Sequence, residues 1–138
     1  MDDCAGDYDV AIIDCSPTMK RLAFNAYLAA AESGMVVIRG TALTVNAIQA
    51  IADALRVSVP EFRILRTCVP GCMTNAERTG EAVLGRFFSG QQLSTVIHAS
   101  SKVCEGSWQW KPVSVFEPGS RPARDYESLA DELWEAMA

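Results

Sequence analysis

The sequence predicts an α/β fold in which a mostly parallel sheet is flanked by helices. Three observations support this prediction. Short, continuously apolar runs recur along the 138 residues, as expected for strands buried on both faces. Segments long enough for helices separate these runs, and glycine, proline, serine or threonine stands at most boundaries. Strands that alternate with helices are typical of a parallel sheet, and we expect one domain covering residues 1–138.

The first predicted strand covers residues 10–14 (VAIID), a short apolar run that ends in a carboxylate. A turn is expected at 15–17, because Ser16 and Pro17 follow the run. Thr18 can cap a helix that continues to about residue 33 and is apolar nearly all round, which predicts that it is well buried. Gly34 suits the end of that helix, because glycine adopts the left-handed conformation of a C-cap at little cost.

Two more strands and a helix are expected before residue 70. Residues 35–39 (MVVIR) and 62–69 (FRILRTCV) have the apolar, β-branched character of buried strands. Between them, Thr44 can cap a helix, and Pro60 ends the segment. The apolar residues of this helix recur at helical spacing on one face, namely Val45, Ile48, Ala52 and Leu55.

The last third of the chain predicts two helices and a strand. A helix is expected at about 75–88 and a strand at 93–98 (LSTVIH). Ser120 and Pro122 suit the beginning of the final helix, because proline is tolerated in a first turn. The expected packing stripe of that helix is Tyr126, Leu129, Leu133 and Met137.

The segment between the last strand and the last helix is the least regular. Residues 99–111 show no clear period, and 112–117 (PVSVFE) are expected to be short and extended. Trp108 and Trp110 lie in this segment. We interpret them as packing a loop onto the core, with stacking on nucleic-acid bases as the alternative.

Composition places the chain among globular proteins. Hydrophobic residues make up 49% and charged residues 21%. The net charge of −5 gives no general attraction to nucleic acid, so DNA contact would need a local basic patch. No apolar run approaches the roughly 18 residues of a membrane span. The acidic beginning, MDDCAGDYD, does not resemble a secretory signal, and we expect a cytoplasmic protein.

The five cysteines have two interpretations. Their number is odd and their spacing contains no CxxC pair, which is typical of scattered reduced thiols. Four nitrogen or sulfur ligands are what zinc requires, so a zinc site from Cys68, Cys72, His98 and Cys104 is the alternative.

The run at 8–14 (YDVAIID) carries the strongest local motif. A hydrophobic strand that ends in aspartate has the form of a Walker B motif. Ligand sites in parallel sheets lie at the carboxyl ends of strands, where the Asp14 carboxylate could hold Mg²⁺ through water. The alternative is that Asp14 caps the following helix.

The order of several motifs resembles the ParA/Soj/MinD group of P-loop ATPases. YDVAIIDCSP is similar to that family's YDyIIIDtPP segment, and the resemblance continues from Tyr8 to the end of the chain. It therefore implies a Rossmann-like fold, an incomplete P-loop NTPase fold corresponding to the family's C-terminal portion. The other matching segments are 22–27 (LAFNAY), 95–98 (TVIH), 111–113 (KPV), 117–121 (EPGSR) and 126–133 (YESLADEL).

The resemblance implies roles for individual residues. Asp14 corresponds to the Walker B carboxylate, which is catalytic and organises magnesium through water. Ser16 lies in the turn that senses the γ-phosphate, and Thr67 and His98 stand where strand ends approach the adenine. Lys102 stands at a position that the family uses for nonspecific DNA binding, and Arg121 is a second candidate. From the residues alone, we interpret His98 as a strand-end residue with one hydrogen bond rather than as a catalytic base, because the spacing fixes no serine or cysteine partner.

Two functions follow from the resemblance. The first is a plasmid or chromosome partition ATPase that uses ATP and Mg²⁺, dimerises, binds DNA nonspecifically near the nucleoid and is stimulated by a ParB-like protein. The second is a non-catalytic module that pairs with a partner protein, with itself or with a full-length ParA-like ATPase. The 138 residues contain no GxxxxGK[ST] loop, the family's Walker A motif, which favours the second function.

Two further expectations concern association. If the 10–14 strand lacks a neighbour, its exposed edge would recruit other strands, which predicts self-association, strand exchange or direct pairing of residues 10–14 with residues 35–39. A MinD-like membrane attachment is not expected, because the final residues, DELWEAMA, are acidic rather than a basic amphipathic helix.

Overall fold

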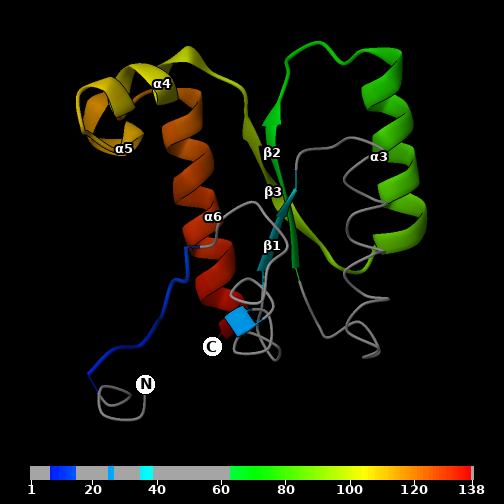
Figure 1. Ribbon diagram of the computed structural model, residues 1–138, viewed down its shortest axis with the longest axis horizontal. Coiled ribbons are helices and arrows are strands. Elements are labelled where there is room, and N and C mark those ends of the chain that lie inside the picture. Colours follow the sequence, from blue (N-terminus) through cyan, green and yellow to red (C-terminus); the bar gives the residue numbers. More distant parts are fainter. Residues whose placement is uncertain (1–6, 15–24, 27–34, 39–62, 138) are drawn as a thin grey trace. The chain divides into compact units, whose positions relative to one another are not determined.

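A computed structural model describes residues 7–14, 25–26, 35–38 and 63–137. The chain divides into two compact units, Met1–Ala31 and Glu32–Ala138, and each is described by itself. The described part of the larger unit contains three strands and four helices (Figure 1). Its elements are β1 (Met35–Ile38), β2 (Arg63–Val69), α3 (Asn75–Phe88), β3 (Gln92–His98), α4 (Ser101–Trp108), α5 (Val113–Phe116) and α6 (Arg121–Met137).

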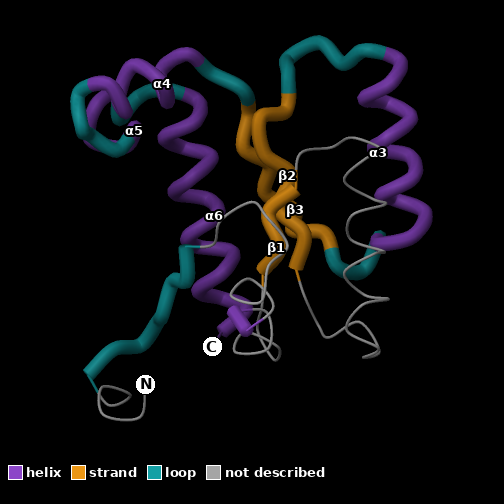
Figure 2. Tube along the Cα trace, viewed as in Figure 1, coloured by secondary structure: helices purple, strands orange, loops and turns teal. Residues whose placement is uncertain are grey.

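The three strands form one parallel sheet in the order β1-β2-β3. Figure 2 shows these strands together in the same part of the molecule. Helices α3 and α6 lie on opposite sides of this sheet (Figure 1). Parallel neighbours require crossover connections, and α3 provides the connection from β2 to β3. The predicted α/β class with a parallel, helix-flanked sheet is therefore confirmed. The expectation of one domain over 1–138 stays a prediction.

The pairing of β2 with β3 is interrupted twice. Ile64 lies opposite Gln92 and Arg66 lies opposite Val96, so two steps along β2 match four steps along β3. The second shift falls between Arg66 and Val69, where Cys68 has a φ of 55°. A left-handed residue other than glycine costs roughly 1–2 kcal/mol, so the irregularity in β2 is held by its surroundings.

The core between the sheet and α6 is a small aliphatic cluster. Leu65 from β2 and Leu93 and Ile97 from β3 pack with Leu129 from α6, and Leu133 closes one side. Side chains alternate along a strand, so the cluster occupies one face of the sheet. Burying each such side chain contributes about 1.5–3 kcal/mol, and this cluster holds α6 against β3.

Helix α3 begins as its sequence predicts. The Thr74 hydroxyl accepts the Glu77 amide at 3.3 Å, and the Glu77 carboxylate accepts the Thr74 amide at 2.7 Å. This capping box satisfies two amides that a helix start leaves unpaired. An ion pair of 2.7 Å between Arg66 and Glu81 then joins α3 to β2.

The predicted strand at 10–14 is wrong within the described residues of the smaller unit. Residues 7–14 form no strand and are exposed, with Ile12 93% accessible. An apolar, β-branched sequence has strand propensity, but a strand also needs a neighbour to complete its hydrogen-bond ladder. Self-association through this segment stays a prediction.

Two predictions between β3 and α6 are also wrong. Residues 101–108 form helix α4, which Ser100 caps by accepting the Lys102 amide at 3.2 Å. Gly106 is the one buried residue of this helix. The sequence therefore has no apolar stripe here from which the helix could have been predicted. The segment expected to be extended contains α5, because the Val115 and Phe116 amides donate to the Pro112 carbonyl.

Helix α6 begins where expected but packs on a different stripe. The Ser120 hydroxyl accepts the Ala123 amide at 3.4 Å, and Pro122 lies in the first turn. Leu129 and Leu133 contact the core, whereas Tyr126 and Met137 are 42% and 53% exposed. The inward face is instead shared with Asp125 and Glu132, which bond to β3.

Several expectations fall outside the described residues. These are the 15–17 turn with Ser16, the helix that follows Thr44, and the outer ends of the strands expected at 35–39 and 62–69. Of the helix expected between Thr18 and residue 33, only residues 25–26 are described, and they are helical.

Candidate functional site at the β3–α6 junction

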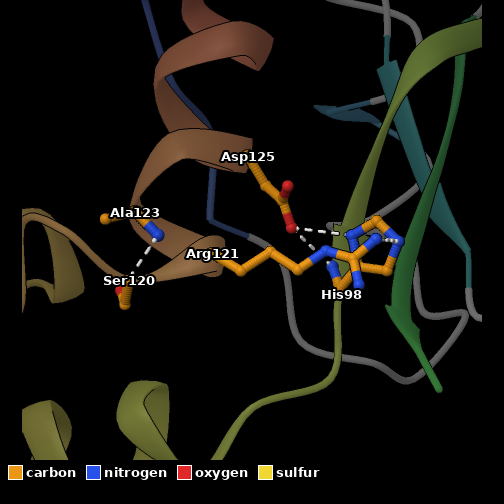
Figure 3. Close-up of polar contacts among 5 residues, drawn as sticks. All are labelled: His98, Ser120, Arg121, Ala123 and Asp125. Carbon is orange, nitrogen blue, oxygen red and sulfur yellow. Dashed lines mark hydrogen bonds and ion pairs between the residues drawn. The ribbon is translucent and has the colours of Figure 1, made fainter. Parts of the chain in front are cut away.

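His98, the last residue of β3, contacts the beginning of α6 through three atoms. Its backbone amide donates to Oδ2 of Asp125 at 2.9 Å, and its ring Nδ1 lies 2.9 Å from the same oxygen. Its ring Nε2 lies 2.7 Å from Nη2 of Arg121. Figure 3 shows the imidazole beside the side chains of Asp125 and Arg121. The strand end and the helix start are therefore joined through one histidine.

These contacts determine which ring nitrogen carries the hydrogen. A guanidinium group can only donate, so Nε2 of His98 must accept from Arg121. In a neutral imidazole the other nitrogen then carries the hydrogen, so Nδ1 donates to Asp125. Both ring nitrogens are thus occupied, and His98 could act as a proton acceptor only after Arg121 moved away.

A second carboxylate on α6 binds the middle of β3. The Ser94 amide donates to Oε1 of Glu132 at 2.7 Å, and the Thr95 amide donates to Oε2 at 2.8 Å. Consecutive amides normally point to opposite edges of a strand, and the irregular pairing of β3 allows both to reach one carboxylate. Burial raises the pKa of Glu132, but hydrogen bonds from Thr95 and Ser94 outweigh it and lower the pKa to about 2.

An open depression of about 370 Å³ lies along this junction. Polar and apolar atoms contribute about equally to its lining, and the polar atoms include hydroxyl groups, one imidazole and one carboxylate. Such a surface offers hydrogen-bond donors and acceptors to a small polar ligand. The lining residues are Ser94, Thr95, Val96, His98, Asp125 and Ser128.

The structure brings some predicted site residues together. His98 and Arg121 are in direct contact, although the resemblance implied separate roles for them. Thr67 is half-buried in β2, two residues before its end, so it lies on the strand next to the one that His98 terminates. Asp14 is exposed in the smaller unit, and its position relative to these residues is not described.

Lys102 is paired with an acidic neighbour on α4. Its ammonium group lies 2.8 Å from Oε2 of Glu105, and the Ser101 hydroxyl donates to the other oxygen of that carboxylate. The hydrogen bond to Glu105 raises the pKa of Lys102, and the same contact lowers the pKa of Glu105. DNA phosphate would have to compete with Glu105 for this charge.

The zinc interpretation finds no support within residues 63–137. Cys68, Cys72 and Cys104 are free and exposed, and the two ring nitrogens of His98 are bonded to Asp125 and Arg121. The described part of the chain holds no group of three or more side chains that could bind a metal ion. None of its helices is long and apolar enough to cross a membrane.

Sequence reasoning missed Asp125 and Glu132. They are seven residues apart, which places them on one face of a helix after two turns. That spacing was visible in the sequence, but carboxylates at such positions are usually solvated. The signal would have been their occurrence on the same face as Leu129 and Leu133, which were expected to be buried.

Three curated relatives cover nearly the whole chain. It is 26% identical over 134 residues to the sporulation initiation inhibitor protein Soj of Bacillus subtilis, which is 92% of this chain and 52% of Soj. It is 26% identical over 136 residues to the chromosome partitioning protein ParA of Myxococcus xanthus, covering 94% of this chain and 47% of ParA. It is 25% identical over 137 residues to the cell division protein PomZ of the same bacterium, covering 95% and 43%.

The chain is related to the ParA-type partition proteins of the ParA/MinD superfamily. No family model matches it. The chain spans about half the length of the curated relatives it matches. The resemblance expected from residues 8–17 and the later motifs is confirmed at the level of the family.

Proposed function

We propose that this chain is a ParA-like partition protein, related to the ATP-dependent, nonspecifically DNA-binding ATPases of plasmid and chromosome segregation. The observation that carries the proposal is the similarity to Soj, ParA and PomZ over 92–95% of the chain. The parallel sheet with helices on both sides supports it, because ligand sites of such sheets lie at the carboxyl ends of strands.

The nucleotide-binding residues that we propose are Asp14, Ser16, Thr67 and His98. Mg²⁺ is held in many nucleotide sites by one or two carboxylates, phosphate oxygens and water, so the single carboxylate of Asp14 fits its requirement. Because Mg²⁺ usually keeps several water ligands and shares substrate phosphates, magnesium would bind together with the nucleotide. When bound, the ion would neutralise phosphate charge. Asp14 would orient its water ligands, and Thr67 and His98 would lie near the base.

Calorimetric titration with ATP, with and without Mg²⁺, tests this proposal. Binding should require Mg²⁺ and should be lost in Asp14→Ala. Asp9→Ala is the matched control, because Asp9 is another exposed aspartate of the same segment. Equal binding by the wild type and Asp14→Ala would refute the role of Asp14. Absence of ATP binding by the wild-type chain would reject the nucleotide proposal and favour the second function below.

The second candidate is a non-catalytic module that acts through a partner protein or a full-length ParA-like ATPase. One observation favours it: both proposed DNA-binding cations are already engaged, Lys102 with Glu105 and Arg121 with His98. The net charge of −5 adds no general attraction to the DNA backbone. Protein contacts, including pairing with a second copy or with a ParB-like protein, do not require these cations.

DNA binding discriminates the two candidates. The partition proposal predicts binding to random-sequence duplex that weakens steeply with salt and is reduced in Lys102→Ala and Arg121→Ala. Each lost phosphate contact should reduce, by roughly one unit, the slope of the logarithm of the binding constant against the logarithm of the salt concentration. Arg63→Ala is the control, because Arg63 is an exposed arginine at the opposite end of the sheet. Binding that is absent at low salt would favour the interaction module.

A further inference from the structure

Helix α6 has a second apolar face that the core does not cover. Tyr126, Ala130, Trp134 and Met137 follow one another at helical spacing and are all exposed, and we call them the apolar row. Trp134 is 61% exposed, although a buried tryptophan would contribute some of the largest apolar area available to a protein. An exposed row of large apolar side chains on one helix marks an interaction surface.

An acidic row runs directly beside the apolar row. Glu127, Asp131 and Glu135 are spaced four residues apart, each following a member of the apolar row, and all three are exposed. At 100° per residue, the centres of the two rows are separated by about a quarter to a third of the helix circumference. One partner surface can therefore contact both rows at once.

The acidic row is not neutralised within the described residues. The three ion pairs recorded there involve Glu81, Asp125 and Glu105, none of which belongs to the row. Arg124, the nearest cation on α6, donates instead to the Gly119 carbonyl at 2.6 Å. Three carboxylates of one sign thus border an exposed apolar strip, and like charges four residues apart repel one another.

This charge pattern selects among possible occupants. A second copy of the chain carries the same acidic row and a net charge of −5, so pairing through this face would bring two identical acidic borders to one interface. Anionic lipid and nucleic acid are disfavoured for the same reason. A segment with apolar side chains bordered by lysine or arginine complements both rows.

We propose that the outer face of α6, formed by the apolar and acidic rows, is a docking surface for a basic amphipathic segment of another protein. The apolar row would bury against the apolar face of that segment, and the acidic row would orient it and accelerate its encounter. The surface uses neither the β3–α6 junction nor any residue of the proposed nucleotide site. Its test is therefore independent of ATP and DNA.

A designed peptide pair provides the probe. The binding peptide is a helix of about 14 residues, roughly 21 Å long, which matches the row from Tyr126 to Met137. It carries leucines on one face and lysines around them, and its counterpart carries glutamates in place of the lysines. Fluorescence anisotropy of the labelled peptides on the whole chain measures both affinities without nucleotide. The lysine peptide should bind at least about tenfold more tightly than the glutamate peptide.

Two variants with matched controls locate the binding. Asp131→Asn combined with Glu135→Gln should weaken the lysine peptide about threefold to tenfold and make binding less sensitive to salt. Asp7→Asn combined with Asp9→Asn removes as much charge from outside the acidic row and should change the affinity little. Trp134→Ser should weaken binding about tenfold, whereas Trp108→Ser, on α4, should not. Circular dichroism checks that each variant is folded, and Tyr126→Ser replaces Trp134→Ser if that variant unfolds.

Charge exchange makes the test decisive. Asp131→Lys with Glu135→Lys should reverse the preference, so that the glutamate peptide binds more tightly. Equal affinity for both peptides, or equal losses in the row variants and their controls, would overturn the proposal. Sedimentation that shows a dimer dissolved by Trp134→Ser would assign the face to a second copy instead. Binding to vesicles rich in phosphatidylserine that depends on Trp134 would assign it to a membrane.

Discussion

Glu132 and Ser94 lie 38 residues apart and are joined by a hydrogen bond of 2.7 Å from a strand amide to a helix carboxylate. The Thr95 amide binds the other oxygen of the same carboxylate at 2.8 Å. Among the described strands β3 lies at the edge of the sheet, where an amide without a strand partner would face water or recruit another strand. The Glu132 carboxylate on α6 therefore accepts hydrogen bonds from strand amides, as the carbonyl groups of a neighbouring strand would.

Glu132 should make stability depend on pH in the acid range. Its pKa is lowered to about 2 from an ordinary value of 4.5, so the folded chain binds fewer protons than the unfolded chain between these values. The contribution of Glu132 is complete above about pH 4.5 and is lost as the pH falls through 2. The free energies of unfolding of the wild type and Glu132→Gln, measured with urea, should therefore differ at neutral pH and become similar in acid.

The matched control for this measurement is Glu135→Gln, three residues along the same helix. Glu135 is exposed, so its substitution should change the free energy of unfolding by less than about 0.5 kcal/mol. A difference between the wild type and Glu132→Gln that stayed constant down to the lowest pH would contradict the role of this carboxylate.

The hydrogen on the His98 ring should be found on Nδ1. The chain contains one histidine, so its ring nitrogens can be assigned without ambiguity by long-range ¹H–¹⁵N correlation. Asp125→Ala removes the acceptor for both the ring and the amide of His98. It should reduce the free energy of unfolding by about 1–3 kcal/mol and release the ring from this tautomer. Asp131→Ala should do neither, and a hydrogen on Nε2 in the wild type would refute the Arg121 contact.

Gly106→Ala should destabilise the corner between α4 and α5. A Cβ at this position would lie 2.9 Å from the Lys111 carbonyl oxygen and 3.3 Å from Cβ of Phe116. The backbone oxygen cannot move freely, because Lys111 follows a turn whose amides bond to Gly106 and Ser107. We expect a loss of about 1–3 kcal/mol in thermal or urea unfolding.

The same substitution in α3 is the control for Gly106. Gly85 is also helical, but a Cβ there would meet nothing within 4 Å. Gly85→Ala should therefore stabilise the chain by about 0.5–1 kcal/mol. If both alanine variants changed stability in the same direction, crowding at the α4–α5 corner would not be the cause.

Tryptophan fluorescence should report three accessible indoles. Trp108 and Trp110 are 86% and 96% exposed, and Trp134 is also mostly exposed, so none of the three is shielded by the core. The folded chain should show emission at long wavelength and efficient acrylamide quenching, close to that of the urea-unfolded chain. Blue-shifted emission that Trp108→Phe or Trp110→Phe removes would show that these side chains are buried.

The sequence predicted elements well where the residues and their neighbours gave the same signal. Helix α3 has an N-cap threonine, a capping glutamate and an amphipathic period, and its predicted range of 75–88 is correct. Strands β2 and β3 were found because a parallel sheet buries both faces and leaves continuous apolar runs. These features depend on nearby residues, which a sequence displays directly.

The predictions that were wrong or missing concern features that depend on residues distant in the sequence. The 10–14 run has strand propensity, yet residues 7–14 form no strand. Strand propensity alone does not provide the hydrogen-bond partners that a strand requires. Trp108 and Trp110 were expected to pack on the core, and their exposure shows that large aromatic side chains are not always interior. Asp125 and Glu132 could not be assigned to β3, because the amides they bind are determined by irregular strand pairing. The roles of Asp14, Ser16 and Thr67 stay predictions.

Asp125 and Glu132 also limit how the gene can change in length. Seven residues of helix rise about 10.5 Å, close to the roughly 10 Å that three residues of strand span from Thr95 to His98. Deleting one codon between the two acids would turn Glu132 by about 100° around the helix and detach it from Ser94 and Thr95. Apart from the core residue Leu129, the intervening positions can therefore vary in identity far more readily than in number, so insertions and deletions should accumulate outside this stretch.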